Sequence, residues 1–298
     1  TQNVDGLHSA AGSENVVALH GRLDLQDLAG VYLRWAQFPL VSRSAAPRRP
    51  LPWASWAATV HHGMAADLYR FQPKSEGYLA FLGRISPEKR PDRAIAIAKR
   101  LGKTLKIAAK VDAADQTYFE EKIEPLLHDP LIEFVGEIGD HQKSAFLGGA
   151  DALLFPIDWP EPFGLVMIEA MACGTPVIAY ACGSVPEVIE QGVTGFIVRG
   201  EDEAIDAVHR LPSLDRAAIR RRFEERFSAT AMAQRYLAIY GRHTADAPAN
   251  VTGSSSTTSC ASWSQVSATR STASHDELLA APPKGSKPVS RTVVMPSA

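Results

Sequence analysis

The sequence has few cysteines, little net charge and no long apolar run, and each absence argues against a class of protein. Three cysteines without a C-x-x-C spacing make neither a disulfide framework nor a metal cluster, so we expect reduced thiols that pack in a core. A formal net charge of −2 gives no electrostatic reason to bind nucleic acid. No apolar run reaches the roughly 18 residues that a membrane span needs.

The start of the chain also lacks a secretory signal. The sequence begins with Thr1 rather than methionine, and no signal peptide follows it. We therefore expect a cytoplasmic protein, and a fragment or an unusual gene boundary at its first residue. With 298 residues, 45% of them hydrophobic and 21% charged, the chain has the composition of one or two globular domains.

The two ends of the chain differ in composition from the rest. Residues 1–14 are small and polar without periodicity, and from about residue 244 the sequence consists mainly of Ser, Thr, Ala and Pro. Such segments lack the apolar content that orders a chain. We therefore predict disorder for residues 1–14 and 244–298.

From Tyr78 to Val198, short apolar runs alternate with helix-like segments. Apolar strands that are separated by helices are typical of a parallel sheet covered on both faces. The sequence therefore predicts an α/β fold with a parallel-sheet domain over residues 76–200. The expected strands are Tyr78–Leu82, Leu105–Ala109, Ile132–Val135, Ala152–Phe155, Pro176–Tyr180 and Gly195–Val198.

Prolines, glycines and capping residues mark the helices of this region. A proline favours the first position of a helix, and a glycine commonly ends one. The expected helices are Pro91–Leu101, Phe119–Leu127, Leu165–Ala172, one that Asp140 caps and that runs to Leu147, and one that Ser184 and Glu187 open as a capping box.

The segments on either side of this region are organised differently. Residues 15–75 contain a helix candidate, Leu23–Trp35, and three strand candidates, and we expect them to form a partial N-terminal domain. The strand candidates are Val16–Leu19, Phe38–Val41 and Ala57–Val60. Residues 201–243 are helical, and their last helix carries an apolar stripe that must pack back against another part of the protein. The stripe consists of Met232, Tyr236, Leu237 and Tyr240.

The run over residues 161–177 combines two carboxylates with the start of a helix. It reads EPFGLVMIEAMACGTPV and lies between two expected strands. Pro162 and Gly164 place Glu161 in the entry loop, whereas Glu169 lies about a turn and a half inside the helix and leans toward its N-terminus. The first N–H groups of the helix point into the same space and make a ready anion site. A phosphate flanked by two hydroxyl-seeking carboxylates describes a nucleotide sugar.

A second loop supplies positive charge. Residues 83–89 read GRISPEK and follow the first expected strand of the sheet. Because ligands bind at the carboxyl ends of parallel strands, Arg84 and Lys89 are suited to clamp a diphosphate there. The alternative is that both are solvated loop charges. The sequence has neither a P-loop nor G-x-G-x-x-G, and without a D-x-D triplet we expect no metal ligands.

The two carboxylates also fit another chemistry, since paired carboxylates serve as general acid and base in hydrolysis. The neighbouring helix N-terminus and the two cations favour hydrogen bonding to sugar and ribose hydroxyls instead. Among the loop histidines, His20 is the best candidate because Gly21 leaves backbone room for a ligand, although a lone loop histidine is more often incidental.

Together these motifs resemble those of the retaining glycosyltransferases of family 4, which have the GT-B fold. Residues 161–177 are similar to the family's E-x7-E motif, and residues 83–89 are similar to its G-R-x-x-x-x-K loop. The loops at 183–187 and 192–195 are similar to the two that follow in the family. The motifs extend from about residue 78 to 200, so the resemblance covers the expected sheet domain. It implies that residues 76–200 form a Rossmann-like domain that binds the nucleotide-sugar donor.

The resemblance implies roles for individual residues. The cations and the helix N-terminus bind the donor diphosphate, Glu169 binds the ribose, and Glu161 binds the transferred sugar. The segment from Val135 to Ile138 borders the base, and His20 lies near the donor sugar. The residues implied to bind the donor are Gly83, Arg84, Lys89, Val135, Ile138, Gly164, Leu165, Val166 and Glu169, and those implied to be catalytic are Glu161 and His20.

The resemblance also implies a reaction. A hexosyl unit passes from a nucleoside diphosphate sugar to an unknown hydroxyl acceptor with retention of configuration, and no metal or other cofactor takes part. The family's enzymes have a complete first domain, whereas only residues 15–75 precede the linker here, so we expect that domain to be incomplete. Two alternatives remain open, which are a donor-binding remnant without transferase activity and a related epimerase or phosphorylase.

Overall fold

The computed structural model of the chain describes residues 33, 36 and 38–245. The expected strand Val16–Leu19 and nearly all of the expected helix Leu23–Trp35 lie outside the described residues, as do residues 1–14. At the other end, the last helix extends to Ala245, two residues into the segment for which we predicted disorder.

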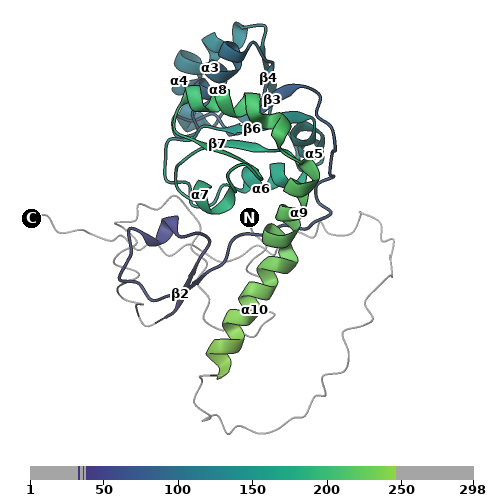
Figure 1. Cartoon of the computed structure of the whole chain (residues 1–298). Coiled ribbons are helices and arrows are strands. Elements are labelled where there is room, and N and C mark those ends of the chain that lie inside the picture. Colours follow the sequence, from purple (N-terminus) through teal and green to yellow (C-terminus); the bar gives the residue numbers. More distant parts are fainter. Residues whose placement is uncertain (1–32, 34–35, 37, 246–298) are drawn as a thin grey trace, which may run out of the picture. The chain divides into compact units, whose positions relative to one another are not determined.

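Six parallel strands form the main sheet, which confirms the predicted α/β fold (Figure 1). Their spatial order is β5-β4-β3-β6-β7-β8. The strands are β3 (Tyr78–Arg84), β4 (Leu105–Lys110), β5 (Ile132–Gly136), β6 (Ala150–Phe155), β7 (Val177–Tyr180) and β8 (Gly195–Val198). Each pair of neighbours is in parallel register, as strands joined by helical crossovers must be.

The helices of the sheet region begin and end close to the predicted residues. The α-helices of the described chain are α3 (Pro91–Leu101), α4 (Gln116–Tyr118), α5 (Asp140–Gly148), α6 (Leu165–Ala172), α7 (Val185–Val188), α8 (Glu201–Arg210), α9 (Arg216–Phe227) and α10 (Ala229–Ala245). Short 3-10 turns are η1 (Ala46–Arg48), η2 (Ala113–Asp115), η4 (Glu124–His128) and η5 (Leu211–Ser213), and η3 (Phe119–Ile123) is a π-helical turn. The expected helix Phe119–Leu127 is therefore a π-helical turn followed by a 3-10 turn, which Pro125 helps to explain because it lacks the N–H that an α-helix uses.

One predicted helix cap and one predicted capping box are wrong. Asp140 is the first residue of α5, and the N-cap is Gly139, whose backbone N–H donates to the side-chain oxygen of Gln142 at 3.0 Å. Ser184 and Glu187 do not form a capping box, because both side chains form hydrogen bonds with residues outside the helix. The hydroxyl of Ser184 donates to the carbonyl of Phe163, and the carboxylate of Glu187 accepts from the backbone of Ala45.

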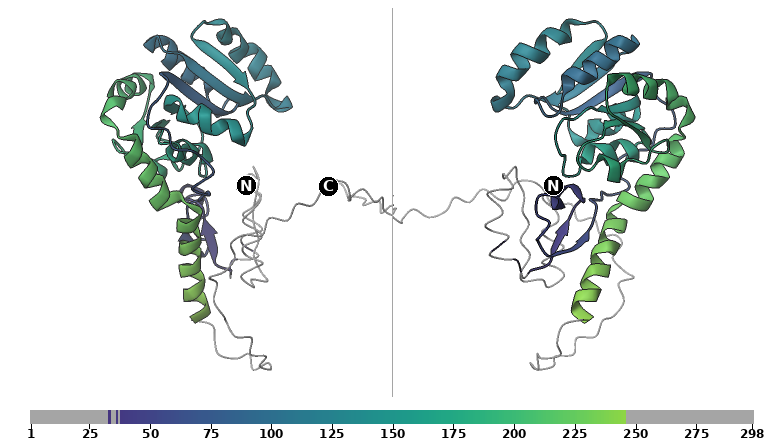
Figure 2. Two further views of the ribbon diagram at one scale, coloured as in Figure 1. Left: turned by 90° about the vertical axis from the view of Figure 1, so that its right-hand side faces the viewer. Right: turned by 60° about the vertical axis from the view of Figure 1, so that its left-hand side comes forward.

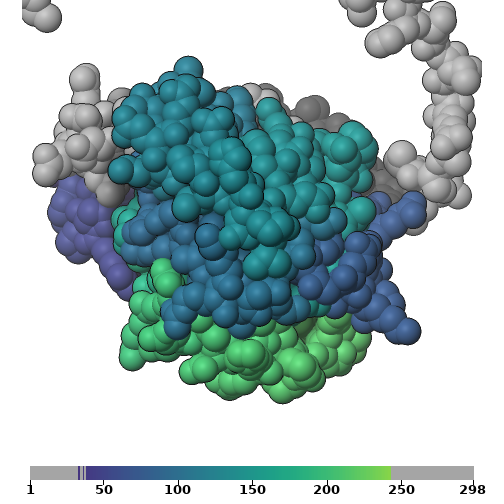
Figure 3. Space-filling view, turned by 90° about the horizontal axis from the view of Figure 1, so that it is seen from above, coloured from purple at the N-terminus to yellow at the C-terminus, as the bar shows by residue number. Residues whose placement is uncertain are grey.

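Alternate residues of the central strands enter two different cores. On β3, Leu79 and Phe81 face a cluster that includes α3 and α8, whereas Ala80 faces a cluster that includes α6 and α9. Figure 3 looks onto the first of these faces, where the blue, teal and green segments pack side by side over the sheet. Because both of their faces are covered, the central strands are mostly apolar, which is why they were recognisable in the sequence.

A separate pair of strands, β1 (Leu40–Ser42) and β2 (Trp56–Thr59), is also parallel. Helix α10 lies beside this pair in both views of Figure 2, and Met232 and Ile239 of α10 pack with Val60 at the end of β2. The predicted apolar stripe therefore packs against another part of the protein, but one of its predicted residues is wrong. Leu237 is 66% exposed, and Ile239 takes the buried place.

The described helices and thiols bear on two further expectations. None of the described helices is long and apolar enough to cross a membrane. The cytoplasmic location stays a prediction. Cys173 is a free thiol in the core, as expected, and its burial raises the pKa of the thiol to about 12.

Arginines of α9 hold the linker between β2 and β3 against the sheet domain. Arg220 donates to the carbonyls of Ala66 at 2.6 Å, Tyr69 at 3.0 Å and Ala172 at 2.5 Å, so one guanidinium joins the linker to the end of α6. Arg216, one turn earlier, donates to the carbonyl of Gln72 in the same linker. A planar group with five N–H donors is suited to such a junction.

Replacing Arg220 with methionine should lower the free energy of unfolding by about 2–3 kcal/mol, because three carbonyls lose their donors. Urea denaturation followed by circular dichroism measures the change. The matched control is Arg221→Met, which changes a neighbouring arginine whose side chain is 61% exposed and should alter stability by less than about 0.5 kcal/mol. Equal effects of the two substitutions would contradict this role of Arg220.

Candidate active site

The middle of the sheet contains a topological switch point. Strands β3 and β6 are neighbours, but the chain continues from β3 outward to β4 and β5, and from β6 outward to β7 and β8. Helix α3 follows β3 onto one face, and α6 packs on the other face after β6. A crevice forms at the carboxyl ends of the strands at such a point, and ligands of open α/β sheets bind there.

A pocket of about 160 Å³ lies at this crevice. Its walls come from the ends of β3 and β6, the loop after β3, and the first turn of α6. The lining residues are Phe81, Leu82, Gly83, Lys89, Phe155, Ile157, Leu165 and Val166. The structure thus brings four of the expected donor-binding residues to one pocket, which are Gly83, Lys89, Leu165 and Val166.

Lys89 forms an ion pair with Glu161 beside this pocket. The two side chains are only 17% and 11% exposed, and the indole N–H of Trp159 donates to the same carboxylate oxygen, Oε2, at 3.0 Å. The ammonium also lies 5.0 Å from the centre of the Trp159 ring and 5.9 Å from that of Phe155. The charge of Lys89 is therefore held in place on several sides before any ligand binds.

Trp159 was not among the predicted site residues. It stands two positions before Glu161, between Asp158 and Pro160. The short spacing between this aromatic residue and the predicted loop carboxylate is visible in the sequence and could have suggested a contact. The orientation of the indole, however, depends on the fold.

The backbone that carries Glu161 packs directly against the loop at residues 183–184. Gly183 has a φ of 57°, and a Cβ atom there would lie 2.3 Å from the backbone nitrogen of Glu161 and 2.4 Å from its carbonyl oxygen. Only glycine allows this approach. Gly183, in the predicted loop at 183–187, therefore allows the backbone of Glu161 to pack closely against this loop.

Helix α6 starts at the pocket. Its N-cap, Gly164, has a φ of 75°, and a Cβ atom there would lie 2.8 Å from the Met167 side chain. Leu165 and Val166 then line the pocket, so the first turn of this eight-residue helix borders it. The N–H groups of a first helical turn have no partner within the helix and favour an anion.

Glu169 lies one turn further into α6 and is held from two sides. Its side chain is 13% exposed, and the ammonium of Lys143 lies 3.4 Å from its Oε1 atom. Burial and the nearby carboxylate of Glu169 raise the pKa of Tyr69, so this phenol stays protonated beside Glu169. Burial opposes the charge of Lys143, but Glu169 and Asp140 outweigh it and raise the pKa of Lys143. Neither Tyr69 nor Lys143 was predicted.

The other expected residues lie at different distances from the pocket. Arg84, at the end of β3, is 40% exposed and reaches Glu88 at 3.3 Å and Asp112 at 3.4 Å. Val135 lies on β5 and Ile138 just beyond it, at the edge of the sheet two strands from β3, and neither lines the pocket. His20 lies outside the described residues.

Solved structures define the class of this fold. The structure is similar to that of AviGT4, a glycosyltransferase involved in avilamycin A biosynthesis, with 27% identity and a TM-score of 0.61 over 70% of this chain and 64% of that chain. It is also similar to Anabaena Alr3699/HepE in complex with UDP and glucose, with 19% identity and a TM-score of 0.62 over 74% of this chain and 68% of that chain. The parallel sheet with its crevice therefore has the GT-B fold of glycosyltransferases, as predicted.

Within this class, the chain belongs to the family described as "Glycosyl transferases group 1". The family model matches residues 70–227, which are more than half of the chain. The chain is also 31% identical over 199 residues to D-inositol 3-phosphate glycosyltransferases of Mycobacterium tuberculosis and Mycobacterium bovis. The match covers 57% of this chain and 40% of those proteins, so the chain spans less than half the length of these relatives.

A double-mutant cycle tests the geometry of the Lys89 and Glu161 pair without any substrate. Lys89→Met and Glu161→Gln should each destabilise the protein, because each leaves the other buried charge without its partner. The double variant should lose less than the sum of the two, with a coupling of about 1–3 kcal/mol by urea denaturation. Additive losses would show that the two side chains are not paired in solution.

Proposed function

We propose that the chain transfers a hexosyl unit from a nucleoside diphosphate sugar to a hydroxyl acceptor, with retention of configuration at the anomeric carbon. The observation that carries the proposal is the ion pair of Lys89 and Glu161 beside the crevice pocket. These are the two residues that the family resemblance assigns to adjoining parts of one donor, the diphosphate and the sugar. A single donor that spans both residues requires them to lie close together, and they are in contact.

Donor binding exchanges the partners of this pair. A diphosphate carries more negative charge than one carboxylate, so it draws Lys89 away from Glu161. The carboxylate then accepts hydrogen bonds from the sugar hydroxyls, and it remains held by the indole of Trp159. With a volume of about 160 Å³ the pocket is smaller than the ligand sites of roughly 300–1,000 Å³ common in proteins, so it holds only part of the donor.

Positive charge at the crevice stabilises the leaving group. As the bond between the anomeric carbon and the diphosphate oxygen breaks, negative charge develops on the diphosphate. Lys89, Arg84 and the first-turn N–H groups of α6 are suited to stabilise it. The acceptor hydroxyl attacks on the same face, and its proton passes to the departing diphosphate, so neither a protein nucleophile nor a metal ion is part of the proposal.

The remaining roles are proposals from the resemblance. Glu169, already held by Lys143 and Tyr69, is suited to accept hydrogen bonds from the ribose hydroxyls. Val135 and Ile138 border the base, and His20 lies near the donor sugar. The complex of Alr3699/HepE with UDP and glucose supports UDP as the first nucleotide to test.

The double variant Arg84→Ala, Lys89→Ala should bind UDP at least about 100-fold more weakly than the unaltered chain, because two charge-assisted contacts of about 1.5–3 kcal/mol each are lost. Isothermal titration calorimetry measures the affinity. The control, Lys99→Ala with Arg221→Ala, removes the same charge from side chains that are 43% and 61% exposed on α3 and α9, and it should leave UDP affinity within about twofold.

Transfer assays with UDP-hexoses decide between the activities. Release of UDP together with a glycoside that keeps the donor's anomeric configuration supports the proposal. Binding of UDP without turnover indicates a donor-binding protein instead, and an epimerised sugar nucleotide or a sugar phosphate indicates an epimerase or a phosphorylase. Unchanged UDP affinity in the Arg84 and Lys89 variant would contradict the assignment of these two residues to the donor diphosphate.

A further inference from the structure

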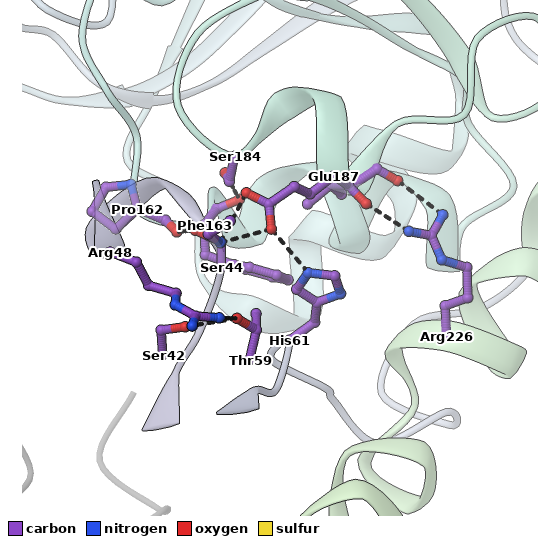
Figure 4. Close-up of polar contacts among 12 residues, drawn as sticks. Ser42, Ser44, Arg48, Thr59, His61, Pro162, Phe163, Ser184, Glu187 and Arg226 are labelled. Carbon is purple, nitrogen blue, oxygen red and sulfur yellow. Dashed lines mark hydrogen bonds and ion pairs between the residues drawn. The ribbon is translucent and has the colours of Figure 1, made fainter. Parts of the chain in front are cut away.

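Three consecutive carbonyls of the loop that carries Glu161 are each held by a buried serine. Figure 4 shows Ser44 and Ser184 beside Pro162 and Phe163 of this loop. The backbone N–H of Ser184 donates to the carbonyl of Glu161 at 3.0 Å, and the hydroxyl of Ser184 donates to that of Phe163 at 2.8 Å. Between them, the carbonyl of Pro162 accepts from the hydroxyl of Ser44 at 2.6 Å. Ser184 belongs to the sheet domain, but Ser44 comes from the segment between β1 and β2.

The same segment also forms hydrogen bonds with helix α7, whose N-cap is Ser184. Both carboxylate oxygens of Glu187 accept from the backbone N–H of Ala45, at 3.0 and 2.8 Å. The ring nitrogen Nε2 of His61, which follows β2, lies 3.3 Å from the Glu187 carboxylate. Arg226 of α9 holds the carbonyl of Glu187 at 2.6 Å. The β1–β2 segment therefore contacts both structures that fix Glu161, its own loop and α7.

An aromatic contact reinforces this junction. Phe163, in the Glu161 loop, is 2% exposed, and its ring meets His62 edge-on at 5.0 Å and Phe227 at 6.1 Å. The ring of His61 lies 5.9 Å from both phenylalanines. Burial lowers the pKa of His61 despite the opposing effect of Glu187, so His61 is neutral at pH 7 and donates one hydrogen bond to that carboxylate.

Among the described residues, the backbone of Pro162 depends on Ser44 for its one hydrogen bond. Pro162 has no N–H of its own, so its carbonyl is its only backbone hydrogen-bonding group. Ser44 is fully buried, and without its hydroxyl the carbonyl of Pro162 loses the donor that the structure gives it. Glu161 directly precedes Pro162, and the proline ring fixes φ, so only rotation about ψ of Pro162 separates this carbonyl from the peptide plane that joins Pro162 to Glu161.

We propose that Ser44 is a positioning residue for Glu161, and that the β1–β2 segment thereby sets the sugar-binding carboxylate of the donor site. The inference rests on the proposed function for its kinetic consequence, but not for its structural one. Ser44 does not touch the donor; it acts through the carbonyl of Pro162. The β1–β2 segment, which precedes the sheet domain, thus helps to position a residue of the donor site.

Ser44→Ala is the first test, and Ser42→Ala is its matched control. Ser42 is also buried, on β1, but its hydroxyl bonds with that of Thr59 at 2.9 Å within the β1–β2 pair. We expect Ser44→Ala to lower kcat for transfer from a UDP-hexose at least about 10-fold, since displaced reacting groups cost such factors, while UDP affinity stays within about twofold. Ser42→Ala should change neither quantity.

Hydrogen–deuterium exchange followed by mass spectrometry provides a readout that needs no activity. Ser44→Ala should increase exchange in residues 159–166 and leave the strands of the main sheet unchanged. If Ser44→Ala does not fold, the isosteric pair Ser44→Thr and Ser44→Val isolates the hydroxyl, and the threonine variant should protect the loop better than the valine variant.

The outcomes separate this inference from the proposed function. Unchanged exchange of residues 159–166 in Ser44→Ala overturns the inference, whether or not the chain transfers sugars. Loss of kcat and UDP affinity in parallel, or increased exchange throughout the sheet, also overturns it, because Ser44 then supports the whole fold. Absence of transfer by the unaltered chain defeats the proposed function, while the exchange measurement still decides the role of Ser44.

Discussion

The parallel pairing of β3 with β6 in the middle of the sheet is the constraint on which the rest of the structure depends. Because the chain leaves these two strands in opposite directions, the helices after them cover opposite faces and cannot close the space above their carboxyl ends. Lys89 after β3 and Glu161 after β6 are 72 residues apart in sequence, and this pairing brings them into contact. The candidate donor site exists because of it.

The charges at the site are balanced before any ligand is present. Lys89 is paired with Glu161, and Lys143 is paired with Glu169, all four with side chains that are no more than about a quarter exposed. An unpaired charge at such depth is costly, so the site needs these pairs in order to be stable. In the function that we propose, a diphosphate that enters between them exchanges one set of partners for another, and this exchange links donor binding to the release of a carboxylate.

Local signals in the sequence explain why so much of the sheet domain was predictable. The strands are buried on both faces and therefore read as apolar runs, and Pro91, Gly102 and Gly174 mark the ends of helices through their own backbone preferences. Two of the predictions that were wrong share one cause, which is competition from distant groups. Ser184 and Glu187 have the spelling of a capping box, but Phe163 and Ala45 offer their side chains better-placed partners. Leu237 similarly fits the spacing of a stripe whose partner surface buries Ile239 instead.

The sequence by itself determined the alternation of strands and helices, the loop carboxylate, the helix N-terminus and the two cations, because these depend on residue types at short spacing. Only the tertiary structure decided that Lys89 pairs with Glu161, that Trp159 and Tyr69 steady the two carboxylates, and that Ser44 holds the carbonyl of Pro162. Each of these contacts except that of Trp159 joins residues more than 70 positions apart. Such a contact leaves no periodic trace in a single sequence, since it depends on how strands are ordered in space.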